Sequence, residues 1–262
     1  MYFDCIAAVA GVEIRAIVRA HPFRLFLPVA ALLVLGSPAL VLFGFEQKAA
    51  LSVQMGLSTA TFFSAIAGLL AGALSMARDR ERGLADLLFA RALHPGALVL
   101  GKYLGILAAL IFAVATLALV HGAATAVRGG PPAGYAAFLA ALALAVVTGS
   151  VSAAAAILFG TRLRPGPAFA AALLFVLAGH AAALLGDSLP ADVLRFLLPR
   201  AGPLNLAADG AFGEVTLSRF TLAALHGLSM SAGLLAIAAA LLSGGHRPNG
   251  MVGILDPAAA PP

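Results

Sequence analysis

Charged residues are scarce in this chain, and their scarcity excludes a soluble globular protein. Only 10% of the 262 residues are Asp, Glu, Lys or Arg, whereas 62% are apolar and the mean hydropathy is +1.03. Soluble domains carry about 25% charged residues, so this supply cannot cover a surface that faces water. The composition therefore indicates a membrane protein whose main surroundings are the lipid bilayer.

Other residue types and motifs are also missing. The single cysteine, Cys5, excludes an intramolecular disulfide and a cysteine-based metal cluster. No H-E-x-x-H or G-x-S-x-G motif occurs, and no acidic residue lies in the long apolar runs, so a membrane-embedded hydrolase is not expected. No basic cluster is interleaved with aromatic residues, which argues against nucleic-acid binding. We therefore expect no catalytic residue and no metal site in this chain.

Six runs without a charged residue are each 21 to 33 residues long, and every other such run has ten residues or fewer. About 20 helical residues cross the 30 Å hydrocarbon core of a bilayer, and helices satisfy their own backbone hydrogen bonds there. The sequence therefore predicts an all-α fold with a six-helix transmembrane domain over residues 24–243. The predicted spans are about 25–45, 55–77, 103–126, 134–160, 167–186 and 220–243.

The two ends of the chain lie outside these spans. Residues 1–23 place apolar side chains at roughly helical spacing with charges between them, which predicts an amphipathic interfacial helix that ends at Pro22. A frayed, only partly helical segment is the alternative. Residues 244–262 end in DPAAAPP and are predicted to be a disordered cytoplasmic tail.

The distribution of Lys and Arg predicts the orientation. With six spans both termini lie on one side, which collects eleven of the sixteen basic residues, and the opposite side holds five. Lys and Arg are enriched on the cytoplasmic side of membrane proteins. We therefore expect a multi-pass protein of the cell (inner) membrane with both termini in the cytoplasm.

The cytoplasmic stretch 78–102 is the richest in polar features. Five consecutive charges at 78–82 and Gly83 precede Leu84, Leu87 and Leu88, which are spaced as i, i+3 and i+4. This spacing predicts a short amphipathic helix between the second and third spans, with its leucines available to a partner. A solvated loop that only enforces topology is the alternative.

The same stretch contains an incomplete nucleotide-binding motif. Gly96, Gly101 and Lys102 fit G-x-x-x-x-G-K-[ST], but Tyr103 occupies the position of the hydroxyl that would contact Mg²⁺. The segment runs into a predicted span and does not follow a strand, so we expect no nucleotide to bind. Lys102 is instead expected to snorkel to the inner interface, with Tyr103 as an interfacial anchor.

The whole layout resembles permease subunits of ABC-2-type transporters. In that family the segment between the second and third spans carries a pattern close to E-x-x-G-T-L-x-x-L-L-x-x-P, followed by a lipid-facing G-K. The matching positions here are Glu81, Gly83, Leu84, Leu87, Leu88, Gly101 and Lys102. The N-terminal segment, with Glu13 ahead of Arg15 and Arg19, is similar to the family's elbow helix. The sequence departs from the pattern at Leu84, which directly follows Gly83, and at Ala92 and Pro95.

The resemblance implies that transport and ATP hydrolysis are carried out by different subunits. Two permeases would pair, as a homodimer or heterodimer, with two ABC ATP-binding subunits, and ATP and Mg²⁺ would bind to those subunits and not to this chain. Closure of the ATP-binding subunits would push on the helix around 79–91 and drive export. The expected contact residues are Arg80, Glu81, Arg82, Gly83, Leu84, Leu87, Leu88 and Arg91, with Glu13, Gly101, Lys102 and Tyr103 at the inner interface.

Two further features within the spans are candidates for function. Gly68 and Gly72 form a G-x-x-x-G helix-packing motif, either within the chain or between two permeases. His180 and His226 lie at similar predicted membrane depth and form a possible intramembrane polar site. They are either structural, bonded to neighbouring helices, or the axial ligands of a haem, which would make the chain a redox subunit instead of a permease.

Overall fold

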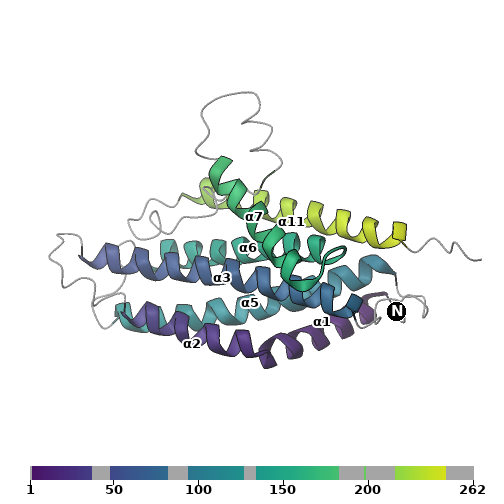
Figure 1. The fold of residues 1–262 in the computed structure, drawn as a ribbon. Coiled ribbons are helices and arrows are strands. Elements are labelled where there is room, and N and C mark those ends of the chain that lie inside the picture. Colours follow the sequence, from purple (N-terminus) through teal and green to yellow (C-terminus); the bar gives the residue numbers. More distant parts are fainter. Residues whose placement is uncertain are drawn as a thin grey trace, which may run out of the picture.

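The computed structural model describes residues 2–36, 48–81, 94–126, 134–182, 198 and 216–245. These residues form an elongated bundle of helices, and no strand occurs among them (Figure 1). The helices are α1 (Tyr2–Arg19), α2 (His21–Gly36), α3 (Lys48–Glu81), α5 (Pro95–Ala126), α6 (Tyr135–Gly160), α7 (Pro165–Ala182) and α11 (Leu217–Gly245). The N-terminus of α1 and the C-terminal end of α11 lie at the same end of the bundle.

Four of these helices are long and apolar enough to cross a membrane, namely α3, α5, α6 and α11. A fifth span results if α1 and α2 are counted together as one broken span. The prediction of an all-helical, multi-pass membrane protein is therefore confirmed. The predicted first and fifth spans correspond to the shorter helices α2 and α7, and their remaining residues, 37–45 and 183–186, lie outside the described residues.

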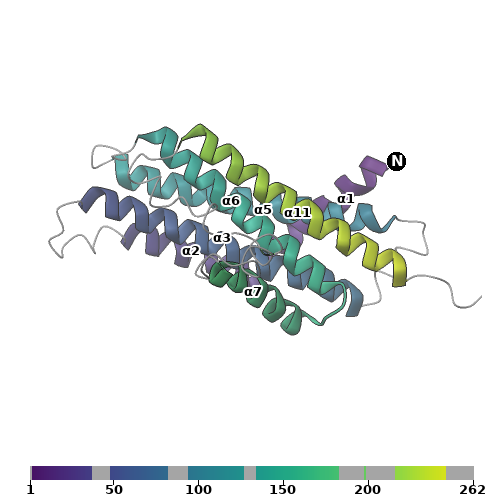
Figure 2. The same cartoon turned by 90° about the horizontal axis from the view of Figure 1, so that it is seen from above.

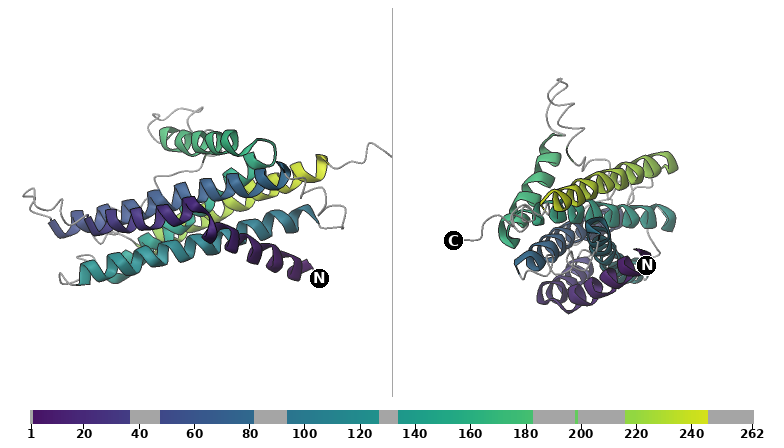
Figure 3. Two further views of the ribbon diagram at one scale, coloured as in Figure 1. Left: turned by 60° about the horizontal axis from the view of Figure 1, so that its bottom comes forward. Right: turned by 90° about the vertical axis from the view of Figure 1, so that its right-hand side faces the viewer.

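Helix α1 meets α2 at a bend of 63° centred on Ala20 (Figure 3). Pro22 follows in the first turn of α2, where its missing N–H removes no helical hydrogen bond. The Arg24 guanidinium donates to the carbonyl of Arg19, with Nε at 3.1 Å, and so satisfies the end of α1. The bend lets α1 leave the direction of the bundle while α2 stays packed on α3 and α5.

The most extensive helix contact joins α3 to α6, and it depends on small residues. A Cβ added to Gly72 would lie 2.6 Å from the carbonyl oxygen of Ala153, and one added to Gly68 would overlap the carbonyl oxygen of Gly149. Close backbone approach of this kind is the usual basis of helix association in membranes. The structure thus places the G-x-x-x-G motif against α6 of the same chain.

The apolar core has two parts along the bundle. One joins α2, α3, α5 and α6 around residues such as Leu57, Leu117 and Phe138. The other lies toward the end where α3 stops and α5 begins, around Leu69, Ile106 and Ile157. Helix α7 lies obliquely across the bundle in Figure 1 and packs on α6 and α3, and α11 runs along α6 and α5 (Figure 2). The end with the second core carries the candidate site.

Candidate functional site: a buried lysine with two carboxylates

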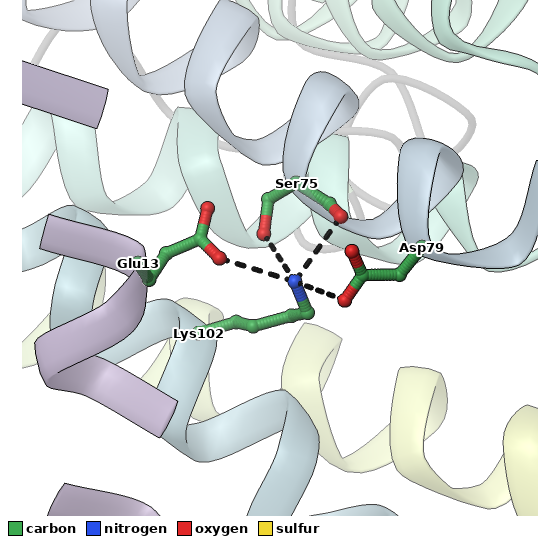
Figure 4. Close-up of polar contacts among 4 residues, drawn as sticks. All are labelled: Glu13, Ser75, Asp79 and Lys102. Atoms are coloured by element: carbon green, nitrogen blue, oxygen red, sulfur yellow. Dashed lines mark hydrogen bonds and ion pairs between the residues drawn. The ribbon is translucent and has the colours of Figure 1, made fainter. Parts of the chain in front are cut away.

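A buried ammonium group joins three helices at one end of the bundle (Figure 4). Lys102 of α5 is only 3% exposed, and its Nζ lies 3.1 Å from Glu13 Oε2 of α1 and 2.7 Å from Asp79 Oδ2 of α3. The same Nζ donates to the carbonyl oxygen and to the hydroxyl of Ser75, each at 3.1 Å. We call these four residues, Glu13, Ser75, Asp79 and Lys102, the Lys102 cluster.

Helical periodicity explains how each helix presents its group. Ser75 and Asp79 are one turn apart on α3, so the Ser75 oxygens and the Asp79 carboxylate face the same direction. Glu13 lies on the buried stripe of α1 with Ile6 and Ile17, at a position where an apolar residue is expected. A charged residue within an apolar stripe is the sequence signal from which a buried partner for Glu13 could have been predicted.

Glycines on α5 allow α1 to approach closely enough for this contact. A Cβ on Gly105 would lie 2.7 Å from Glu13 Cβ and 2.8 Å from the carbonyl oxygen of Ala10. A Cβ on Gly101 would lie 2.7 Å from Val9 Cβ. Gly101 and Gly105 flank Lys102 with G-x-x-x-G spacing, so the backbone of α1 lies directly on α5 beside the lysine. The role of Gly105 was missed from the sequence.

The cluster satisfies the ammonium group but leaves an excess of negative charge. An ammonium group has three donors, and Glu13, Asp79 and Ser75 supply acceptors for all of them. A buried charge is costly to take from water unless it is paired and hydrogen-bonded in this way. With both carboxylates and the lysine ionised, the formal charge of the cluster is −1.

The cluster brackets the segment for which we predicted partner contact. Asp79 lies in the last turn of α3, which ends at Glu81, and Lys102 lies in the second turn of α5, which begins at Pro95. His94 Nδ1 accepts a hydrogen bond of 3.1 Å from Gly96 N and so caps the start of α5. Both helices that lead into and out of residues 82–93 are therefore tied to one another and to α1 by a single ammonium group.

Further polar contacts tie neighbouring helix ends at the same end of the bundle. Arg80 Nη1 donates to the carbonyl oxygen of Thr161, just after α6, at 3.1 Å. Arg162 Nη2 donates to the carbonyl oxygen of Leu241 of α11 at 3.0 Å. Cationic groups at helix C-termini are stabilised by the unpaired carbonyls there. The last turn of α3 is thus connected to α1 and α5 through Asp79 and to α6 through Arg80.

The predicted interface residues differ in their surroundings. Arg80 and Glu81 are exposed at the end of α3. Tyr103 is only 7% exposed and belongs to the apolar core, and Lys102 turns into the bundle to meet two carboxylates instead of snorkelling to water. The other predicted contact residues lie outside the described residues, and these are Arg82, Gly83, Leu84, Leu87, Leu88 and Arg91.

The histidines within the spans occupy separate surroundings. His180 is exposed on α7, with Nδ1 3.0 Å from the carbonyl oxygen of Val176, and His226 is half-buried on α11. Helices α7 and α11 make little contact with each other, since α7 packs on α6 and α3 and α11 packs on α6 and α5. Nothing among the described residues therefore favours a haem held between His180 and His226.

Among the residues that the structure describes, His121 is the one fully buried histidine. It is 3% exposed on α5, and its ring lies 5.3 Å from that of Phe138, measured between centroids. The ring occupies the space above Gly56 of α3, where any Cβ would overlap it. This arrangement packs α5 against α3 and α6 and is structural.

A groove opens beside the Lys102 cluster. It has a volume of about 150 Å³ and lies between the α1–α2 bend and the last third of α3. Glu13, Ser75 and Asp79 line it together with Arg78, and the rest of its wall is apolar, including Phe23, Phe26, Leu70 and Leu74. The groove thus combines a polar end with an apolar channel.

Comparison with known proteins finds no protein-family model that matches the chain and no curated protein sequence with significant similarity to it.

Proposed function

We propose that this chain is the membrane permease subunit of an ABC-2-type exporter, with ATP hydrolysis carried out by a separate ATP-binding subunit. The resemblance of residues 81–102 to the family pattern supports this function, as does the apolar all-helical fold. In this proposal the chain is not itself an enzyme, binds no cofactor directly and acts with a second permease copy.

The number of spans and their orientation in the membrane are part of the same proposal. Six spans result if residues 37–45 extend α2 and residues 183–186 extend α7 to membrane-crossing length. The end of the bundle that holds the Lys102 cluster is then cytoplasmic. Basic residues gather at that end, in agreement with the enrichment of Lys and Arg on the cytoplasmic side, and include Arg15, Arg19, Arg78, Arg80, Arg162 and Arg164.

The single observation that carries the proposal is the position of the Lys102 cluster. Residues 82–93, which hold most of the coupling helix predicted around 79–91, are flanked on one side by Asp79 of α3 and on the other by Lys102 of α5. A push on this segment would reach α3 and α5 together, because their ends are joined by an ion pair of 2.7 Å. Glu13 extends the same connection to α1.

This geometry suggests how force from the ATP-binding subunits would reach the membrane. Packed helices respond to a local push by moving as rigid bodies, and the connections between them decide which helices move together. Here α1, α3 and α5 would move as one unit, and Arg80 would pass part of the movement to α6. In this mechanism the ATP-binding subunits close, the segment 82–93 shifts, and the helices lining the transport path follow.

The experiment that tests the proposal is affinity purification of the full chain from its native membranes in mild detergent. We expect a near-stoichiometric ATP-binding subunit to copurify. The variant Leu87→Asp with Leu88→Asp replaces the apolar face of the predicted coupling helix with charge, and it should lose the ATP-binding subunit while keeping the thermal stability of the permease. The matched control is Leu87→Met with Leu88→Met, which keeps the face apolar and should copurify like the wild type.

Two results would contradict the proposal. A wild-type preparation that contains no ATP-binding subunit would remove the exporter function. If the Asp variant binds the subunit as well as the Met control does, the partner contact lies elsewhere and the role assigned to residues 82–93 is wrong.

A further inference from the structure

The groove beside the Lys102 cluster has the shape and charge of a binding site for one amphipathic molecule. Its apolar part is formed by Phe23 and Phe26 after the α1–α2 bend and by Leu70 and Leu74 of α3. Its polar end is formed by Glu13 and Asp79, and Arg78, an exposed residue, lines the same groove. An apolar chain and a charged head group would therefore each meet matching surroundings.

The two carboxylates have accepting capacity that Lys102 does not use. The ammonium group contacts Glu13 through Oε2 and Asp79 through Oδ2, and Figure 4 shows the second oxygen of Glu13 pointing away from it. Neither second oxygen makes a hydrogen bond or an ion pair with any other part of the chain that the structure describes. Because the Glu13 side chain is 11% exposed and lines the groove, its remaining accessible surface faces this space.

The charges around the groove suit a zwitterionic ligand. The two carboxylates exceed the one ammonium by a formal charge of −1 and favour a cationic group at their end, and with the guanidinium of Arg78 the four groups are formally neutral. Carboxylate oxygens are acceptors only, so a cation that carries N–H donors is better suited than a quaternary ammonium, which has none. Arg78 of the same groove supplies a partner for an anionic group, and a guanidinium pairs well with phosphate.

We propose that this groove binds one phospholipid whose head group carries a primary ammonium, a phosphate and no other charge, that is, phosphatidylethanolamine. Its ammonium donates to the second oxygens of Glu13 and Asp79, its phosphate pairs with Arg78, and an acyl chain lies along Phe23, Phe26 and Leu70. Phosphatidylcholine lacks the N–H donors, and phosphatidylglycerol has no ammonium group to meet the two carboxylates. The inference holds for any function of the chain in the membrane.

Lipid retention by the purified protein tests this site. The full chain is purified in detergent supplied with equal amounts of phosphatidylethanolamine, phosphatidylcholine and phosphatidylglycerol, and bound lipids are counted by native mass spectrometry. We expect one tightly held phosphatidylethanolamine per chain, preferred about tenfold over phosphatidylcholine, as charge-assisted hydrogen bonds from the ammonium would give. Equal retention of the two lipids, or a preference for phosphatidylglycerol, would overturn the proposal.

A variant that fills the groove separates this site from lipid bound elsewhere on the apolar surface. Ala71→Trp adds an indole to the α3 wall of the groove and leaves every charged group in place. Ala115→Trp adds the same group to an exposed position of α5 outside the groove and is the matched control. Ala71→Trp should reduce retained phosphatidylethanolamine about tenfold, whereas Ala115→Trp should retain it like the wild type.

A second variant keeps the test valid if Ala71→Trp does not fold. Ala67→Phe lies on the same wall one turn earlier and fills the groove with a smaller ring. Loss of the tightly held lipid in either stably folded variant supports the site. Retention at the wild-type level in both would place the lipid elsewhere and overturn the inference.

Discussion

At the scale of single residues, the Lys102 cluster is the feature with the strongest energetic consequences. Lys102 Nζ contacts two carboxylates and Ser75 while only 3% of the residue is exposed. Its charge is therefore matched inside the protein instead of by water. Removing the ammonium group would leave two carboxylates close together with no cation between them.

We predict that Lys102→Met destabilises the protein by about 3–5 kcal/mol, the usual cost of removing one partner of a buried ion pair. Thermal unfolding in detergent measures the effect. The triple variant Lys102→Met, Glu13→Gln and Asp79→Asn removes all three charges and should recover much of the stability. If Lys102→Met unfolds like the wild type, the pairing in the cluster contributes nothing to the fold.

The same variants separate stability from coupling. If the chain is the proposed permease, the neutral triple variant should bind the ATP-binding subunit yet fail to link ATP hydrolysis to transport, since the connection from α3 and α5 to α1 is weakened. ATP hydrolysis and transport are measured in reconstituted vesicles. Full transport by the triple variant would show that the cluster serves the fold and not the coupling.

Glu13 offers a second test at this scale. Glu13→Gln removes a charge at a residue that is 9% exposed and should cost about 1–3 kcal/mol, because Lys102 loses one charge-assisted partner but keeps Asp79. Glu81→Gln is the control, since Glu81 is exposed at the end of α3 and its substitution should change the unfolding temperature little. Equal effects of the two substitutions would contradict the buried role of Glu13.

At the scale of elements, close helix contacts decide where α1 lies. Helix α1 packs on α5 through Gly101 and Gly105, whereas α3 packs on α6 through Gly68 and Gly72. Both contacts use glycine pairs with the same spacing, but they join different helices. The position of α1 determines whether Glu13 reaches Lys102 at all.

We predict that Gly105→Ala moves α1 away from α5 and costs about 1–3 kcal/mol, because its methyl group would meet Glu13 Cβ and the Ala10 carbonyl. Gly122→Ala on the same helix has open space around the new methyl group and should be neutral or stabilising by up to about 1 kcal/mol. Thermal unfolding compares the two variants. Similar unfolding temperatures would mean that α1 is not held against α5 in this way.

At the scale of the whole molecule, the arrangement of the described helices determines which ends share a side. The start of α1, the turn after α6 and the end of α11 lie at one end of the bundle, and the starts of α6 and α11 lie at the other. The basic residues at the first end assign it to the cytoplasm in the proposed topology.

Cysteine labelling tests this orientation in a Cys5→Ser background, which has no other cysteine. We expect Tyr135→Cys and Leu217→Cys, both at exposed positions, to react with an impermeant maleimide added outside spheroplasts. Leu163→Cys and Ser243→Cys, which are exposed at the opposite end, should react only after the membrane is opened. The reverse pattern would invert the topology and place residues 82–93 out of reach of a cytoplasmic subunit.

The sequence by itself determined the class of the protein and most of its long helices. Charge-free runs of span length arise because every charged side chain in hydrocarbon is costly, so the predicted spans around 55–77, 103–126 and 134–160 agree with α3, α5 and α6. The spans expected at 25–45 and 167–186 are only partly covered by α2 and α7. Local composition predicts where a helix can exist, and it carries much less information on where the chain bends.

Only the tertiary structure decided which residues meet. From sequence, Lys102 beside Tyr103 fits a snorkelling lysine, and Asp79 within five consecutive charges fits a solvated surface. In the structure, Lys102 turns inward to Asp79 and to Glu13, which is 89 positions away in sequence. Glu13 reaches the lysine because the chain bends at Ala20 and α1 lies over Gly105. The apolar stripe of α1 shows that Glu13 is buried but not which helix supplies its partner, and the energy of the pair depends on burial that the packed bundle alone provides.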